Sequence, residues 1–171
     1  GRLGLAWYDD LETFRGVQAS PLVIDGVLYN ESIYNVVTAY DGKTGRKLWT
    51  YDPGVGPEWA RLACCGPSAR GIAAWKGKLY IGALDGRLIA IDQKTGKEVW
   101  TAQTFPEGHE YSITGAPRIG VFEVFARENL RGPERERPGA ERPLQVRPDV
   151  REPEVGALFA DHQRRGIGVG R

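Results

Sequence analysis

The chain has 171 residues and a formal charge of +1, with 23 Lys and Arg against 22 Asp and Glu. This balance does not favour a partner that is nucleic acid or a membrane surface. No apolar run approaches the roughly 20 residues that a membrane helix needs. The length suffices for one domain with a substantial core.

The N-terminus begins in the middle of a pattern. Residues 1–7 read Gly-Arg-Leu-Gly-Leu-Ala-Trp, the chain contains no methionine, and its first residues do not show the pattern of a signal peptide. We therefore expect a fragment, or one piece of a longer product. Trp7 is predicted to close the final strand of a preceding, truncated repeat.

Two later stretches superimpose without gaps at an offset of 51 residues. Residues 25–29 recur at 76–80, and residues 39–49 recur at 90–100. Self-similarity with a period near 50 residues is typical of solenoids and propellers, with one supersecondary unit per repeat.

Each repeat is predicted to hold four short antiparallel strands, because segments rich in Val, Ile and Tyr alternate with Asp-Gly or Lys-Thr-Gly turns. Four strands per repeat make a propeller blade. The sequence therefore predicts an all-β fold, a partial β-propeller over residues 1–119. The expected strands are Pro21–Ile24, Val27–Asn30, Val36–Tyr40 and Lys47–Tyr51, then Gly71–Trp75, Lys78–Gly82, Arg87–Ile91 and Glu98–Thr101.

A shared element, Ala-x-Asp-x-x-Thr-Gly-x-x-x-Trp, ends each repeat at Trp49 and Trp100. Its Asp and Thr side chains can cap the turn, and its Gly supplies a positive φ. We expect each Trp to pack flat against the neighbouring blade.

The pattern stops near Ile119. Residues 120–171 contain no Lys, Trp or Tyr, but they contain ten Arg and five Pro. We predict an irregular, disordered or extended segment here. One interpretation is a tail of mixed charge. The other is a frameshift or junction near residue 120, because Arg, Pro, Gly and Ala without Lys are typical of GC-rich DNA read in a wrong frame.

Cys64 and Cys65 are the only cysteines, and they are neighbours. Consecutive Cα atoms lie about 3.8 Å apart, whereas disulfides usually span roughly 4.4–6.8 Å. A bond between them would be strained, and strained disulfides tend to be the reducible or functional ones. The plain alternative is two small, inert residues in a loop.

Three motifs together resemble the pyrroloquinoline quinone (PQQ)-dependent alcohol dehydrogenases, which are periplasmic quinoproteins with an eight-bladed propeller. The motifs are the tryptophan-docking element, residues 64–71 (Cys-Cys-Gly-Pro-Ser-Ala-Arg-Gly) and residues 111–118 (Tyr-Ser-Ile-Thr-Gly-Ala-Pro-Arg). The resemblance covers about two-thirds of the chain. It implies about two four-stranded blades of that propeller.

The resemblance implies roles for five residues. A Cys64–Cys65 disulfide would lie against one face of PQQ, and Arg70 and Thr114 would contact its polar groups. Without the resemblance, Arg70 could be a surface salt bridge and Thr114 an ordinary strand residue. Gln18 stands where the family often has a cofactor-contacting Glu, and it carries no charge.

The resemblance also implies a Ca²⁺ or lanthanide ion beside PQQ, and an Asp that acts as general base. Their segments are missing here, so we assign no catalytic residue and no metal ligand. Glu123 and Glu128 match no motif, and His109 and His162 lack metal-ligand spacing.

The expected function is oxidation of small primary alcohols to aldehydes in the periplasm, with electrons passing to PQQ and then to a haem or cytochrome c acceptor. By itself the chain is expected to show no turnover. The rival hypothesis is a non-catalytic propeller scaffold, such as the outer-membrane assembly lipoprotein. The cysteine pair with Arg70 and Thr114 favours the enzyme family.

Overall fold

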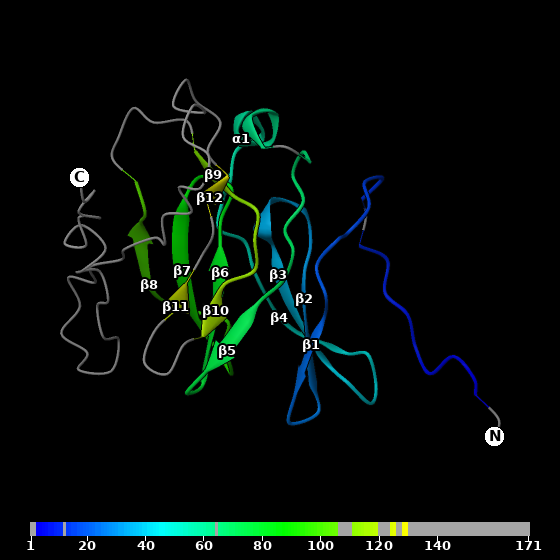
Figure 1. The fold of residues 1–171 in the computed structure, drawn as a ribbon. Coiled ribbons are helices and arrows are strands. Elements are labelled where there is room, and N and C mark those ends of the chain that lie inside the picture. Colours follow the sequence, from blue (N-terminus) through cyan, green and yellow to red (C-terminus); the bar gives the residue numbers. More distant parts are fainter. Residues whose placement is uncertain are drawn as a thin grey trace, which may run out of the picture.

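The computed structural model describes residues 3–11, 13–63, 65–105 and 111–119, together with the backbone of residues 124–125 and 128–129. Two four-stranded antiparallel sheets lie side by side, each a meander in chain order (Figure 1). The first holds β1 (Leu22–Ile24), β2 (Val27–Glu31), β3 (Val37–Asp41) and β4 (Lys47–Tyr51), and the second holds β5 (Ala73–Trp75), β6 (Lys78–Gly82), β7 (Arg87–Asp92) and β8 (Glu98–Gln103). The eight predicted strands are confirmed, with bounds that shift by at most two residues.

Four two-residue strands follow the second sheet. β9 (Ser112–Ile113) pairs with β12 (Glu128–Asn129), and β10 (Arg118–Ile119) pairs with β11 (Val124–Phe125). The rest of the predicted disordered or frameshifted segment, 120–171, lies outside the described residues.

The two sheets use the same turns. The β1–β2 turn has positive φ at Asp25 and Gly26, and the β5–β6 turn repeats this at Lys76 and Gly77, as short hairpins require. The β3–β4 turn is closed by the Asp41 carboxylate, which accepts bonds from the Thr44 backbone N–H and hydroxyl, both at 2.8 Å. The corresponding Asp and Thr 51 residues later repeat both bonds at 2.8 Å. The predicted capping role of this element is confirmed.

The tryptophans dock on turns of the next unit. A Cβ atom placed on Gly96 would lie 2.5 Å from Cδ2 of Trp49, and one placed on Gly45 would lie 2.6 Å from Cδ2 of Trp7. Trp7 Nε1 also donates to the Gly42 carbonyl at 3.0 Å. Glycine is therefore needed at these turns for close approach as well as for positive φ.

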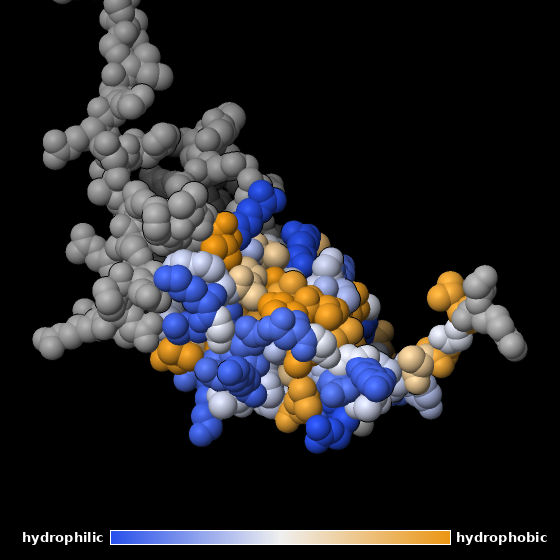
Figure 2. Space-filling model, turned by 90° about the horizontal axis from the view of Figure 1, so that it is seen from below, coloured by the Kyte–Doolittle hydropathy of each residue, from blue (hydrophilic) through white to orange (hydrophobic). Residues whose placement is uncertain are grey.

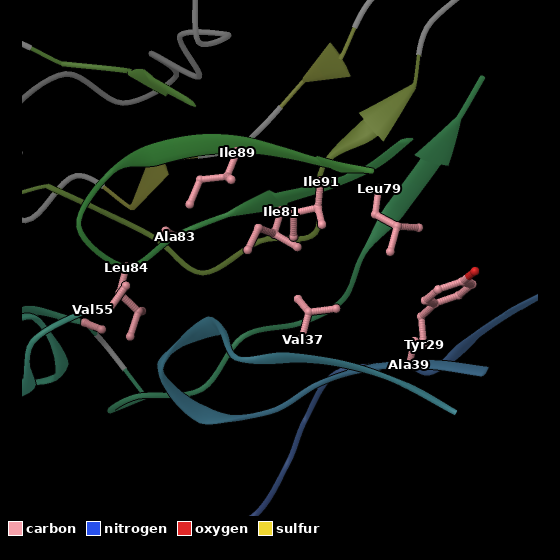
Figure 3. Packing of buried hydrophobic residues seen from close by; sticks show 11 residues of the cluster. Tyr29, Val37, Ala39, Val55, Leu79, Ile81, Ala83, Leu84, Ile89 and Ile91 are labelled. Atoms are coloured by element: carbon pink, nitrogen blue, oxygen red, sulfur yellow. The ribbon is translucent and has the colours of Figure 1, made fainter. Parts of the chain in front are cut away.

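A continuous apolar core fills the space between the sheets. Figure 3 shows Tyr29, Val37 and Ala39 of the first sheet opposite aliphatic side chains of the second. The second-sheet members include Leu79, Ile81, Ile89 and Ile91, each 0% exposed. The two sheets therefore form one packed body.

Two short helices were not predicted. The 3₁₀ helix η1 (Ile33–Asn35) joins β2 to β3, and α1 (Pro57–Leu62) lies between β4 and the cysteine loop. Pro57 suits the first turn of α1, where its missing N–H costs nothing. Within the described residues, no helix has the length and apolar character needed to cross a membrane.

Some apolar surface stays exposed. Seen from the end that carries the β1–β2 turn, Figure 2 shows an apolar area framed by hydrophilic side chains. Val23, on the edge strand β1, is 61% exposed. Leu3 and Phe14 of the N-terminal segment are fully exposed.

Candidate functional site

Three segments that lead into successive strand groups meet at one place. Ser20, ahead of β1, forms a parallel bridge with Gly71, ahead of β5. A Cβ atom on Gly71 would lie 3.7 Å from Cβ of Ala116, which precedes β10. The fold therefore brings together three chain segments that lie far apart in sequence. The predicted site residues on these segments are Gln18, Arg70 and Thr114.

The cysteine loop presents two of the predicted residues together. Nη2 of Arg70 lies 3.5 Å from Sγ of Cys65, and both residues are exposed. Cys64 lies outside the described residues. The structure thus places a cation and a sulfur atom side by side on the loop surface.

The base of the same loop is held from the first sheet. The Tyr34 backbone N–H donates to the Pro67 carbonyl at 2.9 Å, and the neighbouring Ser68 and Ala69 are 7% and 3% exposed. The anchored base gives Cys65 and Arg70 a fixed support. Arg15 lies nearby, since a Cβ atom on Gly66 would be 3.3 Å from its Nη1.

The other two predicted residues differ in exposure. Gln18 is exposed, whereas Thr114 is 1% exposed. Both lie on the converging segments, two residues from Ser20 and Ala116 respectively. The structure therefore brings their backbones to the site, with Thr114 on its buried side.

A buried polar pair beside this place was missed from the sequence. Glu31 is 1% exposed, and its Oε1 accepts a bond of 2.9 Å from Nδ2 of Asn35. Asn35 also reaches the second sheet, because Nδ2 donates to the Gly82 carbonyl at 3.1 Å and Oδ1 accepts from the Leu84 N–H at 2.9 Å. Among the described residues, Oε2 of Glu31 has no hydrogen-bond partner.

Burial raises the pKa of Glu31 to about 8, although the Asn35 amide and the Gly71 N–H oppose that rise by stabilising the charged form. The sequence did hold a signal for this residue. A strand alternates its faces with a period of two, so Glu31 shares the buried face of Tyr29. The predicted strand ends at Asn30, one residue short of the observed end of β2.

No group of three or more His, Cys, Asp or Glu side chains within the described part of the chain is arranged to hold a metal ion. His109 and His162 lie outside that part.

Comparison with known proteins agrees with the propeller fold. The model of the PQQ family, described as glucose/ethanol/alcohol dehydrogenase, beta-propeller domain, matches residues 5–115. The quinohemoprotein alcohol dehydrogenase ADH IIB of Pseudomonas putida is 52% identical over 117 residues, which are 68% of this chain and 17% of that protein.

Solved structures give the same result. The crystal structure of the quinohemoprotein alcohol dehydrogenase from Comamonas testosteroni is similar with a TM-score of 0.70 and 48% identity, covering 74% of this chain and 19% of that one. BamB from Moraxella catarrhalis has a TM-score of 0.55 at 21% identity over 72% of this chain and 35% of that one, which shows the fold alone.

The chain spans about a fifth of the length of the dehydrogenases that it matches. Its two blades, its tryptophan-docked turns and the family match over residues 5–115 agree with one another. The chain belongs to the PQQ-dependent glucose/ethanol/alcohol dehydrogenase family, and it holds part of that family's β-propeller domain.

Proposed function

We propose that this chain is part of a PQQ-dependent alcohol dehydrogenase and supplies one face of its quinone site. The observation that carries the proposal is the exposed Arg70 guanidinium beside the Cys65 sulfur, 3.5 Å away, where three segments converge. Two relatives about half identical to this chain are named quinohemoprotein alcohol dehydrogenases.

The residues present fit such a cofactor. PQQ is flat and carries carboxylates, and a guanidinium can bind a carboxylate through two N–H groups at once. Arg70 and the Gln18 amide are exposed donors, whereas the Thr114 hydroxyl would donate from the buried side. A Cys64–Cys65 disulfide would cover one face of the ring system. PQQ, when bound, supplies the acceptor for the hydride of an alcohol.

The protein groups named here bind and orient the cofactor, and none of them removes the alcohol proton. The general base and the ligands of a Ca²⁺ or lanthanide ion would come from the remaining blades. We therefore propose that small primary alcohols are the substrates of the whole enzyme, and that this chain by itself has no turnover.

The electron acceptor and the compartment follow from the same proposal. The relatives' names combine a quinone with a haem, so we propose a haem group or a cytochrome c as the acceptor. A vicinal disulfide persists in an oxidising compartment, which supports a periplasmic location.

A non-catalytic scaffold is the weaker alternative. The likeness to BamB concerns the fold. A scaffold gives no reason for a solvent-facing sulfur and guanidinium on an anchored loop.

The test is a titration of the purified chain with PQQ, followed by quenching of tryptophan fluorescence. We expect saturable binding with a Kd on the order of 100 µM, because only one face of the site is present. Arg70→Ala should weaken it about tenfold, as expected for a charged hydrogen bond.

The matched control is Arg61→Ala, which removes an exposed guanidinium from the last turn of α1. This variant should bind PQQ like the unchanged chain. Absence of saturable binding, or equal losses in both variants, would overturn the proposal. Alcohol-dependent dye reduction by the chain with PQQ and Ca²⁺ would disprove the expected lack of turnover.

A further inference from the structure

The turn between β2 and β3 contacts both the cysteine loop and the second sheet. In η1 the Tyr34 backbone N–H donates to the Pro67 carbonyl at 2.9 Å. The next residue, Asn35, is fully buried, and its Nδ2 donates to the Gly82 carbonyl at 3.1 Å while its Oδ1 accepts from the Leu84 N–H at 2.9 Å. η1 therefore joins the base of the cysteine loop to the connection between β6 and β7.

The two blades share the backbone of this turn but differ in one residue. The Ser32 N–H donates to the Val36 carbonyl at 2.8 Å, and the equivalent bond 51 residues later measures 2.7 Å. At the same offset Asn35 corresponds to Gly86, and their φ values are +62° and +82°. Glycine adopts positive φ without steric cost, whereas asparagine is only moderately suited to it. The first blade therefore keeps a side chain where the second has none, and that side chain makes the contacts with the second sheet.

The side chain of Asn35 fits this place in one orientation. Its two amide protons go to the Gly82 carbonyl and, at 2.9 Å, to Oε1 of Glu31, and its oxygen receives the Leu84 N–H. Turning the amide by 180° would set its NH₂ group against the Leu84 N–H and its oxygen against the Gly82 carbonyl. Such mismatches are costly in a buried place. The hydrogen bonds therefore fix η1 relative to the second sheet.

We propose that Asn35 is a positioning residue for the cysteine loop: its side chain sets η1 against the second sheet, and η1 holds the loop base through the Tyr34 N–H. The role of that loop in binding PQQ rests on the proposed function. Pro67, which accepts the Tyr34 bond, is buried and lies between the exposed Cys65 and Arg70. Tyr34 has a φ of +56°, which a tyrosine seldom adopts, so its surroundings must impose this conformation.

The test measures the PQQ affinity of Asn35→Gly, which introduces the residue of the second blade. Glycine keeps the positive φ and removes the three side-chain bonds, so the variant separates backbone conformation from hydrogen bonding. Binding should weaken about fivefold, roughly the value of one hydrogen bond. In the Arg70→Ala background the further loss should stay below about twofold, because both changes act on the same loop. Asn30→Ala, a half-buried asparagine of β2, is the control and should bind like the unchanged chain.

Amide hydrogen exchange followed by NMR is a second readout that does not need the cofactor. Asn35→Gly should speed exchange of the Tyr34 amide about fivefold or more, while the amides of β3 and β7 keep the rate of the unchanged chain. Unchanged exchange at Tyr34, or equal losses of affinity in both Arg70 backgrounds, would overturn the inference. Failure of Asn35→Gly to fold, or faster exchange throughout both sheets, would also overturn it, because Asn35 would then serve general stability.

The two proposals fail in different ways. If the unchanged chain does not bind PQQ, the proposed function fails, and exchange at the Tyr34 amide alone then decides whether Asn35 holds the loop.

Discussion

The two blades are nearly identical at one end and different at the other. At the turn end, the β1–β2 and β3–β4 turns of the first blade recur in the second with the same positive φ values and the same Asp–Thr bonds. At the opposite end, the first blade continues into η1 and, after β4, into α1 and the cysteine loop. The repeated end docks neighbouring blades, and the varied end carries the candidate site.

The difference shows that one position of a repeat can change its side chain while the strands keep their packing. Position 31 holds a buried carboxyl in the first blade, and position 82 holds glycine in the second. In the first blade the Glu31 carboxyl accepts a hydrogen bond from Asn35, whereas in the second blade Ile113 occupies the space beside Gly82. The strands themselves need not change.

The largest effect should come from the core that both blades share. Ile81→Ala should lower the free energy of unfolding by about 2–5 kcal/mol, because this fully buried side chain lies between the sheets. Asn30→Ala, at the corresponding position of the first blade, is half-buried and should cost under about 1 kcal/mol. Urea denaturation measures the loss of unfolding free energy in both variants. Equal losses would contradict a core in which Ile81 packs between the two sheets.

The next largest effect is a dependence of the unfolding free energy on pH. Glu31 of the first blade should produce it, whereas its counterpart Gly82 in the second blade cannot titrate. The folded state raises the pKa of Glu31 from 4.5 to about 8, so between these values the folded chain binds more protons than the unfolded chain. Its contribution is complete below about pH 4.5 and is lost as the pH rises toward 8, with a limiting slope of about 1.4 kcal/mol per pH unit.

Glu31→Gln lacks this titration, so its stability relative to the unchanged chain should increase steadily from pH 5 to pH 8. Denaturant titrations of both proteins at each pH give the difference. Parallel profiles would show that the carboxyl of Glu31 is ionised over this pH range in the folded chain as well as in the unfolded chain.

The smallest effect concerns the repeated turns. Asp41→Ala and Asp92→Ala each remove a carboxylate that accepts bonds from the backbone and the hydroxyl of a Thr three residues later. We expect each substitution to destabilise the chain slightly, because both carboxylates are exposed to solvent. The melting temperatures of the two variants should fall by similar amounts. A fall in only one variant would contradict the equivalence of the two turns.

The repeat itself was predictable because its signals are local. Asp-Gly turns, alternating apolar residues and the Asp-Thr-Gly-Trp element each act within a few residues, and all eight strands follow from them. The helix α1 was missed because six residues are too few for a periodic apolar pattern. η1 was missed because it depends on positive φ at Tyr34 and Asn35, and a tyrosine seldom adopts this conformation.

The candidate site was predictable only in part. The motifs identified Cys65 and Arg70, which the fold places in contact. Glu31 could not be recognised as a buried residue between the sheets, because its partner Asn35 meets the second sheet at a backbone group, the Gly82 carbonyl, which lies 47 residues further along the chain. Glycine carries no side-chain signal of such a contact.

The most direct test of the central claim is PQQ binding by the oxidised chain compared with the reduced chain, with thiol alkylation to count free cysteines in each. We predict that the oxidised chain resists alkylation at Cys64 and Cys65 and binds PQQ, and that reduction or Cys65→Ser weakens binding at least fivefold. Two alkylated thiols in the unreduced chain, with PQQ affinity unaffected by reduction, would contradict the claim that this loop forms one face of a quinone site.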